Sequence, residues 1–339
     1  MEIFLPVANM SVNVFVIVGL GALVGLMSGM FGVGGGFLLT PLLMMYGIPP
    51  AVAVASDSTQ IVAGSASGAY AHKKLGNVDM KLGLLLLAGG ISGGTIGVQI
   101  VKVLRSLGNF EFFVKLIYVV VLGVVGGLML RESLVAIRNL WLRQAKHETI
   151  QELQDRQELK DLAPLLDQID REITAEPEKQ SFWQRVAAAL PFQTEFKRAG
   201  IRTSVLFPFA LGMIVGILAA IMGVGGGFIM VPSMIYILGM RTIIAVGTDL
   251  FQIVFTSTNV AFQQAWQNHT VDIVLVILLF TGSTIGAQFG ARIGAKIKGP
   301  HLRLILSVIV LAVMIKLLSD LLMAPDSLIS LAGASGGGH

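Results

Sequence analysis

The feature that most constrains this chain is a glycine-rich motif that occurs twice, each time inside a long apolar stretch. The first copy covers residues 30–37 (MFGVGGGF) and the second covers residues 221–228 (IMGVGGGF). Glycine disfavours a helix by up to about 1 kcal/mol per residue, so each motif predicts a break between two helical segments. A broken helix at membrane depth is tolerated only inside protein or beside a water-filled cavity. Two breaks in corresponding positions of two halves are typical of a transporter's substrate site.

Composition indicates a membrane protein. Of the 339 residues, 54% are hydrophobic and only 13% are charged, whereas ordinary globular chains carry about 25% charged residues. Half of the charges, 22 of 44, lie within residues 132–200, so the net charge of +4 does not indicate a nucleic-acid partner. The chain has no cysteine, which excludes disulfides, thiolate catalysis and thiolate metal sites. The first residues lack a basic segment before the apolar run, so no cleaved signal peptide is expected.

Apolar runs predict ten membrane segments, since a spanning helix needs about 20 apolar residues. The expected helices cover residues 11–31, 36–47, 51–72, 81–103, 110–130, 203–222, 227–239, 243–265, 272–293 and 302–323. The second and the seventh are short and directly follow the two glycine motifs. They are therefore expected to be half helices.

The two halves match beyond the glycine motifs. AVASD at 53–57 answers AVGTD at 245–249, and GTIGVQ at 94–99 answers STIGAQ at 283–288. Each repeat has five helices, an odd number, so the halves must lie in opposite orientations across the membrane. The predicted fold class is an all-α polytopic membrane protein with a 5+5 inverted repeat and discontinuous helices at the two breaks.

The predicted organisation has four parts. They are a first membrane repeat at 11–131, a charged helical linker at 132–202, a second membrane repeat at 203–323 and a flexible tail at 324–339. Most Lys and Arg residues of the short loops fall on the side of the linker, which favours a cytoplasmic linker and external termini. The linker is either a solvated helical hairpin or a regulatory, oligomerising coiled coil, and a homo-oligomer stays open.

The start of each half helix predicts a site for a small anion. A helix N-terminus presents free N–H groups and about half a positive charge, and glycine lets a ligand approach these groups closely. Tight helix packing through small residues is the alternative interpretation. The candidate ligand-binding glycines are Gly32, Gly34, Gly35 and Gly36 in the first motif and Gly223, Gly225, Gly226 and Gly227 in the second.

A polar helix face follows each half helix. Its candidate ligands are Ser56, Asp57 and Gln60 in the first half and Thr248, Asp249, Gln252 and Asn259 in the second. A carboxylate inside a membrane span is a functional candidate by default. Protonated Asp57 or Asp249 could donate a hydrogen bond to an anion and couple its transport to protons. The equally open alternative is that both cap the nearby start of their helix.

Four other polar residues lie in or next to predicted membrane helices, two glutamines and two aspartates. Gln99 and Gln288 lie within predicted spans, where each is either a further ligand or part of an interhelical hydrogen bond. Asp79 and Asp272 each precede a predicted helix and are most simply N-caps.

An enzyme is not expected. The sequence shows no nucleophile–base pair and no histidine pair with metal-ligand spacing, and the glycine motif lacks the Gly-Lys-Ser/Thr of a P-loop. We therefore expect no cofactor and no metal.

The motifs together resemble the TauE/SafE sulfite exporter family of bacterial permeases. The residues that carry the resemblance are 29–37 with Pro41, 55–58 and 72–78 in the first half, and 223–228 with Pro232, 247–249 and 282–286 in the second. The resemblance implies a multi-pass carrier of the bacterial inner membrane that moves a small sulfur-containing anion, such as sulfite or an organosulfonate. A small-anion channel on the same scaffold, or a membrane partner protein that docks through its charged insert, are the alternatives.

Overall fold

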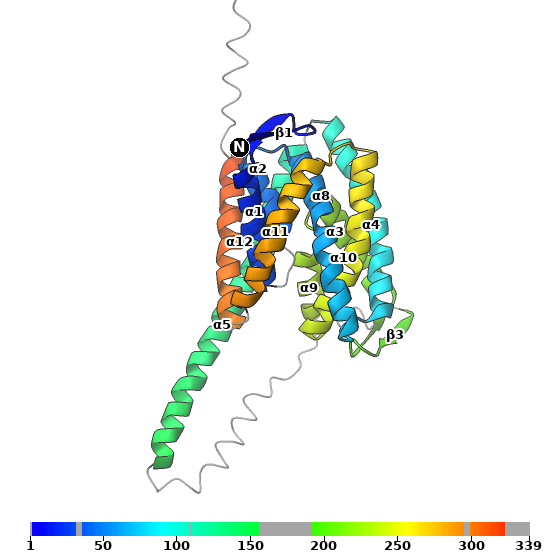
Figure 1. Ribbon diagram of the computed structural model, residues 1–339. Coiled ribbons are helices and arrows are strands. Elements are labelled where there is room, and N and C mark those ends of the chain that lie inside the picture. The colour runs from blue at the N-terminus through cyan, green and yellow to red at the C-terminus, as the bar shows by residue number, and fades with distance from the viewer. Residues whose placement is uncertain (1, 32–35, 109, 156–190, 295–298, 323–339) are drawn as a thin grey trace, which may run out of the picture.

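The structure is a computed structural model that describes residues 2–31, 36–108, 110–155, 191–294 and 299–322 (Figure 1). Most of these residues are helical, as predicted for an all-α membrane protein. Residues 32–35 of the first glycine motif, residues 156–190 of the predicted linker and the tail at 324–339 lie outside the described residues.

The two halves contain the same elements in the same order. The first half consists of β1 (Glu2–Leu5), β2 (Met10–Asn13), α1 (Val14–Phe31), α2 (Gly36–Met45), α3 (Pro50–Lys74), α4 (Met80–Ser106) and α5 (Phe110–Asp155). The second half consists of β3 (Gln193–Phe196), β4 (Ile201–Ser204), α8 (Leu206–Met222), α9 (Gly227–Tyr236), α10 (Thr242–Trp266), α11 (Ile273–Gly294) and α12 (Gly299–Leu322). Every predicted helix is found, and all ends but one lie within three residues of the prediction.

Five segments are long and apolar enough to cross a membrane. Within the described ranges they are Met80–Ser106, Phe110–Asn139, Thr242–Trp266, Ile273–Gly290 and Leu304–Leu322. The helices α1, α2, α8 and α9 are shorter but also apolar. The structure is thus a mostly helical protein with the lengths and composition that a membrane bundle needs.

Two short β-hairpins were not predicted. Strands β1 and β2 pair antiparallel from Glu2 opposite Asn13, and strands β3 and β4 pair in the same way from Gln193 opposite Ser204. Helix α1 consequently starts three residues later than the predicted 11, because residues 10–13 belong to β2. Figure 1 shows β1 and β3 at opposite ends of the bundle.

Helix α5 is much longer than predicted. It continues without interruption to Asp155, although the sequence predicted a membrane helix that ends near 130 and a separate linker from 132. No proline or glycine occurs between Gly127 and Pro164, so nothing in the local sequence ends the helix. The far part of α5 projects from the bundle in Figure 1.

The two halves interlock instead of packing as separate bodies. The most extensive helix pairs are α1 with α11, α4 with α8, α5 with α12 and α3 with α10, and each pair joins one half to the other. The hydrophobic core accordingly mixes the halves, with Phe37 and Tyr118 of the first beside Met222 and Phe228 of the second.

Glycines allow the closest of these helix pairs to form. On α11, a methyl group added at Gly282, Gly286 or Gly290 would overlap carbonyl oxygens of α1, at Val18, Ala22 and Leu26 respectively. On α4, Gly89 and Gly93 approach carbonyl oxygens of α8 in the same way. Small residues at four-residue spacing are how membrane helices bring their backbones together.

This close approach predicts a large difference between two glycine-to-alanine variants. We expect Gly286→Ala to destabilise the fold by about 1–3 kcal/mol, because the added methyl group overpacks the α1–α11 contact. Gly19→Ala on α1 is the matched control, since nothing lies within 4 Å of the added methyl group. Thermal unfolding in detergent, followed by size-exclusion chromatography, measures both. Equal melting temperatures for the two variants would contradict the close approach.

Candidate functional site

The second glycine motif breaks a helix as predicted. Helix α8 ends at Met222, and α9 starts at Gly227. Between them Gly223, Gly225 and Gly226 have φ angles of 80°, 69° and 91°. This left-handed region is readily open only to glycine. Gly226 is the N-cap of α9 and makes no side-chain capping hydrogen bond.

The first motif is only partly described. Helix α1 ends at Phe31, and α2 starts at Gly36, which is buried. Gly32, Gly34 and Gly35 lie outside the described residues, so their predicted contact with a ligand stays a prediction.

The two half helices meet at a pair of aromatic rings. Phe37 and Phe228 are the second residues of α2 and α9, and their rings stack with centroids 4.2 Å apart and planes 9° from parallel. Both rings are fully buried. The stack holds the starts of the two half helices next to each other, in the interior of the bundle.

Asp57 lies beside the start of α2. Its Oδ2 accepts a hydrogen bond of 2.8 Å from Thr40 Oγ1 on α2. Its Oδ1 is buried and has no hydrogen-bond partner among the residues that the structure describes. A methyl group added at Gly36 would lie 3.3 Å from this Oδ1. The unpartnered carboxyl oxygen therefore faces the first residue of a half helix.

Ser257 occupies a comparable place beside the second break. Its Oγ is buried without a hydrogen-bond partner, and a methyl group added at Gly225 would lie 3.3 Å from it. The same added methyl group would be 2.9 Å from Ile61 of α3. Gly36 and Gly225 each thus lie beside one buried polar atom that lacks a partner within the described part of the chain. Such atoms are uncommon in folded proteins and call for a ligand or water.

Asp249 starts a hydrogen-bonded ladder on α10. Its Oδ1 accepts from Gln252 Nε2 at 3.1 Å, and Gln252 Oε1 accepts from Thr256 Oγ1 at 2.8 Å. All three side chains are buried. These three side chains form a hydrogen-bonded row on one face of the helix, and their contact with a ligand stays a prediction.

The capping interpretation of Asp57 and Asp249 is wrong. Helix α3 starts at Pro50 and α10 at Thr242, so each aspartate lies two turns inside its helix. The N-cap of α10 is Arg241. By contrast, Asp79 and Asp272 do cap, because each accepts a hydrogen bond from the amide three residues later.

Other predicted ligands point elsewhere. Ser56 and Thr248 accept hydrogen bonds from the backbone N–H groups of Asp272 and Asp79, at 3.2 and 3.1 Å. Gln60 donates to Ser283 Oγ on α11 at 2.5 Å. These side chains therefore join helices, and their contact with a ligand stays a prediction.

The remaining candidates lie farther along the bundle. Asn259 and Gln263 on α10 both donate to Thr95 Oγ1 on α4, at 3.3 and 2.8 Å. Gln99 donates to Gln267 Oε1 at 2.7 Å, so its interpretation as an interhelical hydrogen bond is confirmed. Gln267 follows Asp249 by 18 residues, which is about 27 Å along α10. Gln288 is exposed on α11.

Three residues of the site were not predicted. Thr40, which holds Asp57, stands next to the proline of the first motif, and Ser257 follows Thr256 of the predicted polar face. Tyr118 of α5 is fully buried and donates a 2.5 Å hydrogen bond to the carbonyl oxygen of Met222, the last residue of α8. The signal for Tyr118 was a lone tyrosine hydroxyl in the middle of an apolar span, where it needs a partner.

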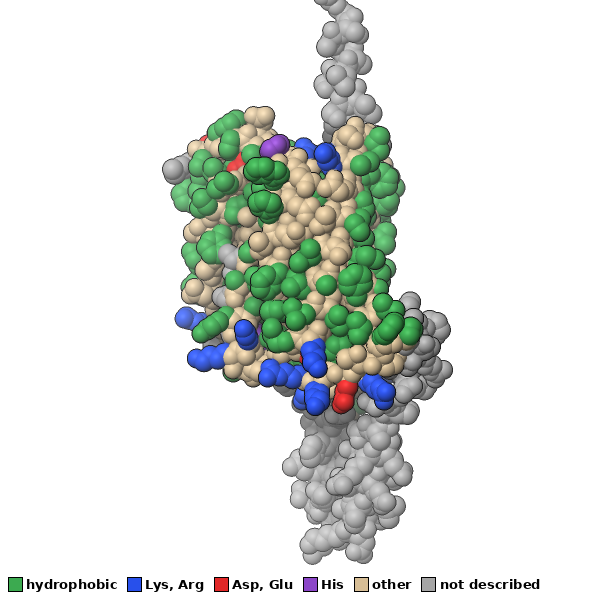
Figure 2. All heavy atoms as spheres, turned by 90° about the vertical axis from the view of Figure 1, so that its right-hand side faces the viewer, with side chains coloured by type: hydrophobic (Ala, Val, Ile, Leu, Met, Phe, Trp, Pro, Cys, Tyr) green, Lys and Arg blue, Asp and Glu red, His purple; other side chains and the backbone are tan. Residues whose placement is uncertain are grey.

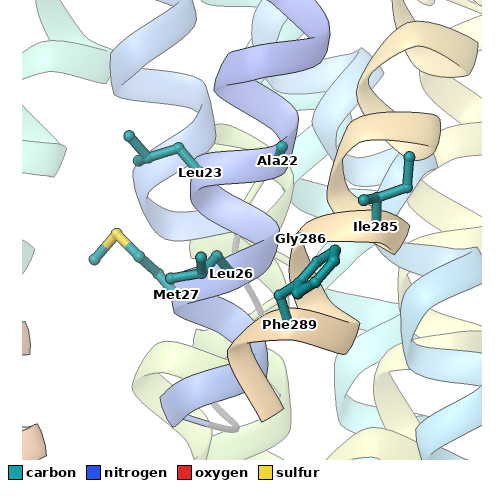
Figure 3. A pocket seen from close by; sticks show the side chains of 7 residues that line it. All are labelled: Ala22, Leu23, Leu26, Met27, Ile285, Gly286 and Phe289. Carbon is teal, nitrogen blue, oxygen red and sulfur yellow. The ribbon is translucent and has the colours of Figure 1, made fainter. Parts of the chain in front are cut away.

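A separate hollow on the bundle is apolar. It measures about 430 Å³ and is lined, as Figure 3 shows, by Ala22, Leu23, Leu26 and Met27 of α1 and by Ile285, Gly286 and Phe289 of α11. None of these side chains can donate a hydrogen bond, so the hollow is not part of the candidate site for a polar ligand.

Loss of the Thr40 hydroxyl gives a test of the Asp57 environment. We expect Thr40→Val to destabilise the fold by about 1–3 kcal/mol, because the buried carboxyl group of Asp57 then loses its hydrogen bond from the Thr40 hydroxyl. Thr59→Val is the matched control, since the Thr59 hydroxyl bonds only to the Ala55 carbonyl of its own helix. The melting temperatures of both variants are measured in detergent. If Thr59→Val lowers the melting temperature as much as Thr40→Val does, the bond from Thr40 to Asp57 has no special role.

Curated proteins of Bacillus subtilis (strain 168) are similar to this chain. Probable membrane transporter protein YjnA is 24% identical over 309 residues, which cover 91% of this chain and 100% of that protein. Probable membrane transporter protein YunE is 36% identical over 84 residues, 24% of this chain and 31% of that protein. Probable membrane transporter protein YdhB is 33% identical over 79 residues, 23% of this chain and 32% of that protein. The chain thus matches about a third of the length of two relatives and the full length of the third.

No solved structure matches the chain. The family model described as Sulfite exporter TauE/SafE matches residues 17–317, which include both glycine motifs and every helix of the site. The chain therefore belongs to the TauE/SafE sulfite exporter family.

Proposed function

We propose that this protein is a secondary transporter that exports a small sulfur-containing anion, such as sulfite or an organosulfonate. The family and the relatives named as membrane transporters support transport as the general activity. The anion binds between the N-termini of α2 and α9, near the middle of the membrane.

One observation carries this proposal. The stacked Phe37 and Phe228 bring the starts of α2 and α9 together, and an unpartnered buried oxygen lies beside each break, on Asp57 and on Ser257. Helix N-termini attract anions through their free N–H groups and their dipoles. Because both half helices start at this point, a small oxyanion there meets two positive helix ends at once.

Proton coupling follows from the carboxyl group of Asp57. An ionised carboxylate would repel an anion at the start of α2, whereas a protonated one can donate a hydrogen bond from Oδ1. The donors to Asp57 and Asp249 are the neutral side chains of Thr40 and Gln252, which do not neutralise a charge. A carboxyl group that takes up a proton together with the anion would couple the two movements.

The architecture proposed for this carrier is the 5+5 inverted repeat. Matching hairpins, matching breaks and matching glycine contacts support it, since α1 with α11 corresponds to α8 with α4. The position of β1 and β3 at opposite ends of the bundle supports opposite orientations of the halves (Figure 1). When two such halves exchange their conformations, one central site is exposed first to one side of the membrane and then to the other.

The proposed location is the bacterial inner membrane, with the linker at 132–202 in the cytoplasm and the termini outside. Lys and Arg side chains gather at the lower end of the bundle in Figure 2. Helix α3 ends there with Lys73 and Lys74. Positive residues of short loops favour the cytoplasmic side.

Flux into liposomes tests the transport proposal. The purified protein is reconstituted and given sulfite, sulfoacetate, thiosulfate or sulfate at two internal pH values. We expect saturable flux of one of these anions that responds to the proton gradient. Conductance without saturation or proton response would indicate a channel, and no flux of any anion by folded protein would contradict the proposed substrate class.

A variant at the second break tests the site in the same liposomes. Gly226→Val should reduce flux to that of empty liposomes, because Gly226 has a φ of 91° and an added methyl group lies 2.8 Å from Val215. Gly127→Val on α5 is the control, since nothing lies within 4 Å of its added methyl group. Normal flux through Gly226→Val would contradict binding at the half-helix start.

Proton coupling predicts the effect of removing the titrating groups. Asp57→Asn should keep the hydrogen bond from Thr40 and lose the dependence of flux on the proton gradient. Asp249→Asn separates the contributions of the two aspartates. Asp320→Asn is the control, because Asp320 pairs with Lys316 on α12 away from the breaks. An unchanged pH profile in both site variants would leave the aspartates without a coupling role.

A further inference from the structure

A buried carboxylate fixes the β3–β4 hairpin to the bundle. Asp79 Oδ2 accepts a hydrogen bond of 3.0 Å from the backbone N–H of Ala199 in the hairpin turn. Its Oδ1 accepts from the N–H of Leu82 at 3.1 Å and thereby caps α4. The N–H of Asp79 itself donates to Thr248 Oγ1 on α10 at 3.1 Å. One residue thus joins the hairpin, the start of α4 and the helix that carries Asp249.

The β1–β2 hairpin is fixed by the matching carboxylate at the other end of the bundle. Asp272 Oδ2 accepts from the N–H of Val7 in the hairpin turn at 2.9 Å. Its Oδ1 accepts from the N–H of Leu275 at 3.2 Å and caps α11. The N–H of Asp272 donates to Ser56 Oγ on α3 at 3.2 Å. The three bonds repeat those of Asp79, with every distance within 0.1 Å.

Each hairpin places part of its side chains inside the protein, while other turn residues, among them Val7 and Arg198, are exposed. Leu5, Ala8 and Val12 of the first hairpin and Phe196 and Ala199 of the second are buried. Asp79 and Asp272 are themselves 4% and 0% exposed. A hydrogen bond to a buried carboxylate is stronger than one between neutral groups. Each turn is therefore held to the bundle by a strong hydrogen bond from its backbone to a buried carboxylate.

We infer that Asp79 and Asp272 are the latches of two gates, and that the β3–β4 and β1–β2 hairpins are the gates at the two ends of the transport pathway. This inference rests on the proposed transport function. Each latch contacts the residue directly before a site aspartate, Thr248 before Asp249 and Ser56 before Asp57. Opening of a hairpin at one end releases the helix that carries the site aspartate nearest that end. Asp79 and Asp272 thus act as positioning residues, with no contact to the anion required.

The two ends differ in their described contacts: Asp79 binds Ala199, whose counterpart in the first hairpin is Ala8, whereas Asp272 binds Val7. At the β3–β4 end Arg198 Nη1 also donates to the carbonyl oxygen of Val78, at 3.2 Å, directly beside the Asp79 latch. In the turn of the other hairpin the corresponding position is Val7, which offers only its backbone N–H to Asp272. The β3–β4 gate is therefore held by one more charge-assisted bond than the β1–β2 gate.

Labelling of a single cysteine from each side of the membrane tests the latches, and it does not require that the transported anion is known. The chain contains no cysteine, so Ser257→Cys supplies one reporter beside the second break in the full-length protein. The reagent is 2-sulfonatoethyl methanethiosulfonate, a membrane-impermeant anion, added to right-side-out and to inside-out membrane vesicles. Asparagine at 79 or 272 still caps its helix through one oxygen, but its amide nitrogen cannot accept the bond from the hairpin.

The two latch variants should raise the labelling rate from opposite faces of the membrane. We expect Asp79→Asn to raise the labelling rate from the face of the β3–β4 hairpin by about five-fold or more, and Asp272→Asn to do so from the other face. Thr248→Ala and Ser56→Ala, which each remove one acceptor of a latch, should shift labelling in the same directions. Asp320→Asn should change neither face.

Two outcomes would overturn the inference. One is equal labelling from both faces in each latch variant, which would make the carboxylates general anchors of the fold. The other is unchanged labelling in all four variants. If side-specific labelling occurs but none of the tested anions is transported, the gates stand and only the proposed substrate is wrong.

Discussion

The rest of the structure depends on how the backbone N–H and C=O groups at the helix breaks find hydrogen-bond partners inside an apolar bundle. A lipid-exposed break would leave N–H and C=O groups unpaired, at several kcal/mol for each group. Here the carbonyl oxygen of Met222, at the end of α8, accepts from Tyr118, and the N–H of Gly223 bonds back to Ala219. Helices from both halves therefore have to surround the breaks. The interlocking of α1 with α11 and of α4 with α8 meets this need, because their glycines let the covering helices approach closely.

The same interlocking determines which parts of the bundle can move together. Backbones that touch through Gly286 or Gly93 cannot slide without overlap, so α1 with α11 and α4 with α8 behave as stiff pairs. Asp272 caps α11 and Asp79 caps α4, and each holds the hairpin that precedes the partner helix in its pair. Each stiff pair thus carries its own hairpin, while α3 and α10 connect the pairs to the site. Movement of one pair relative to the other changes the surroundings of Asp57 and Asp249.

The sequence predicted the helices and the second break well, because apolar length and glycine runs act locally. It missed the two hairpins, since strands of four residues carry almost no periodicity and their turns are stabilised by Asp79 and Asp272, far away in the sequence. The bonds of Ser56 and Thr248 to distant backbone N–H groups could not be predicted for the same reason. The sequence also left open whether Asp57 and Asp249 cap their helices, because only the structure shows where each helix starts. Thr40 and Tyr118 were missed because their partners lie on other helices.

The two halves satisfy their matching aspartates in different ways, and the difference follows from single substitutions between the repeats. Thr40 of the first half corresponds to Val231 of the second, which has no hydroxyl to offer Asp249. Asp249 instead takes its hydrogen bond from Gln252 on its own helix. Asp57, by contrast, is tied to the half helix α2 through Thr40. A displacement of α2 must therefore break or stretch the bond to Asp57, whereas no described hydrogen bond joins Asp249 to α9. The two aspartates occupy equivalent positions in the two repeats but have different hydrogen-bond donors. Only the bond to Asp57 comes from a half helix, so the surroundings of Asp57 depend on the position of α2.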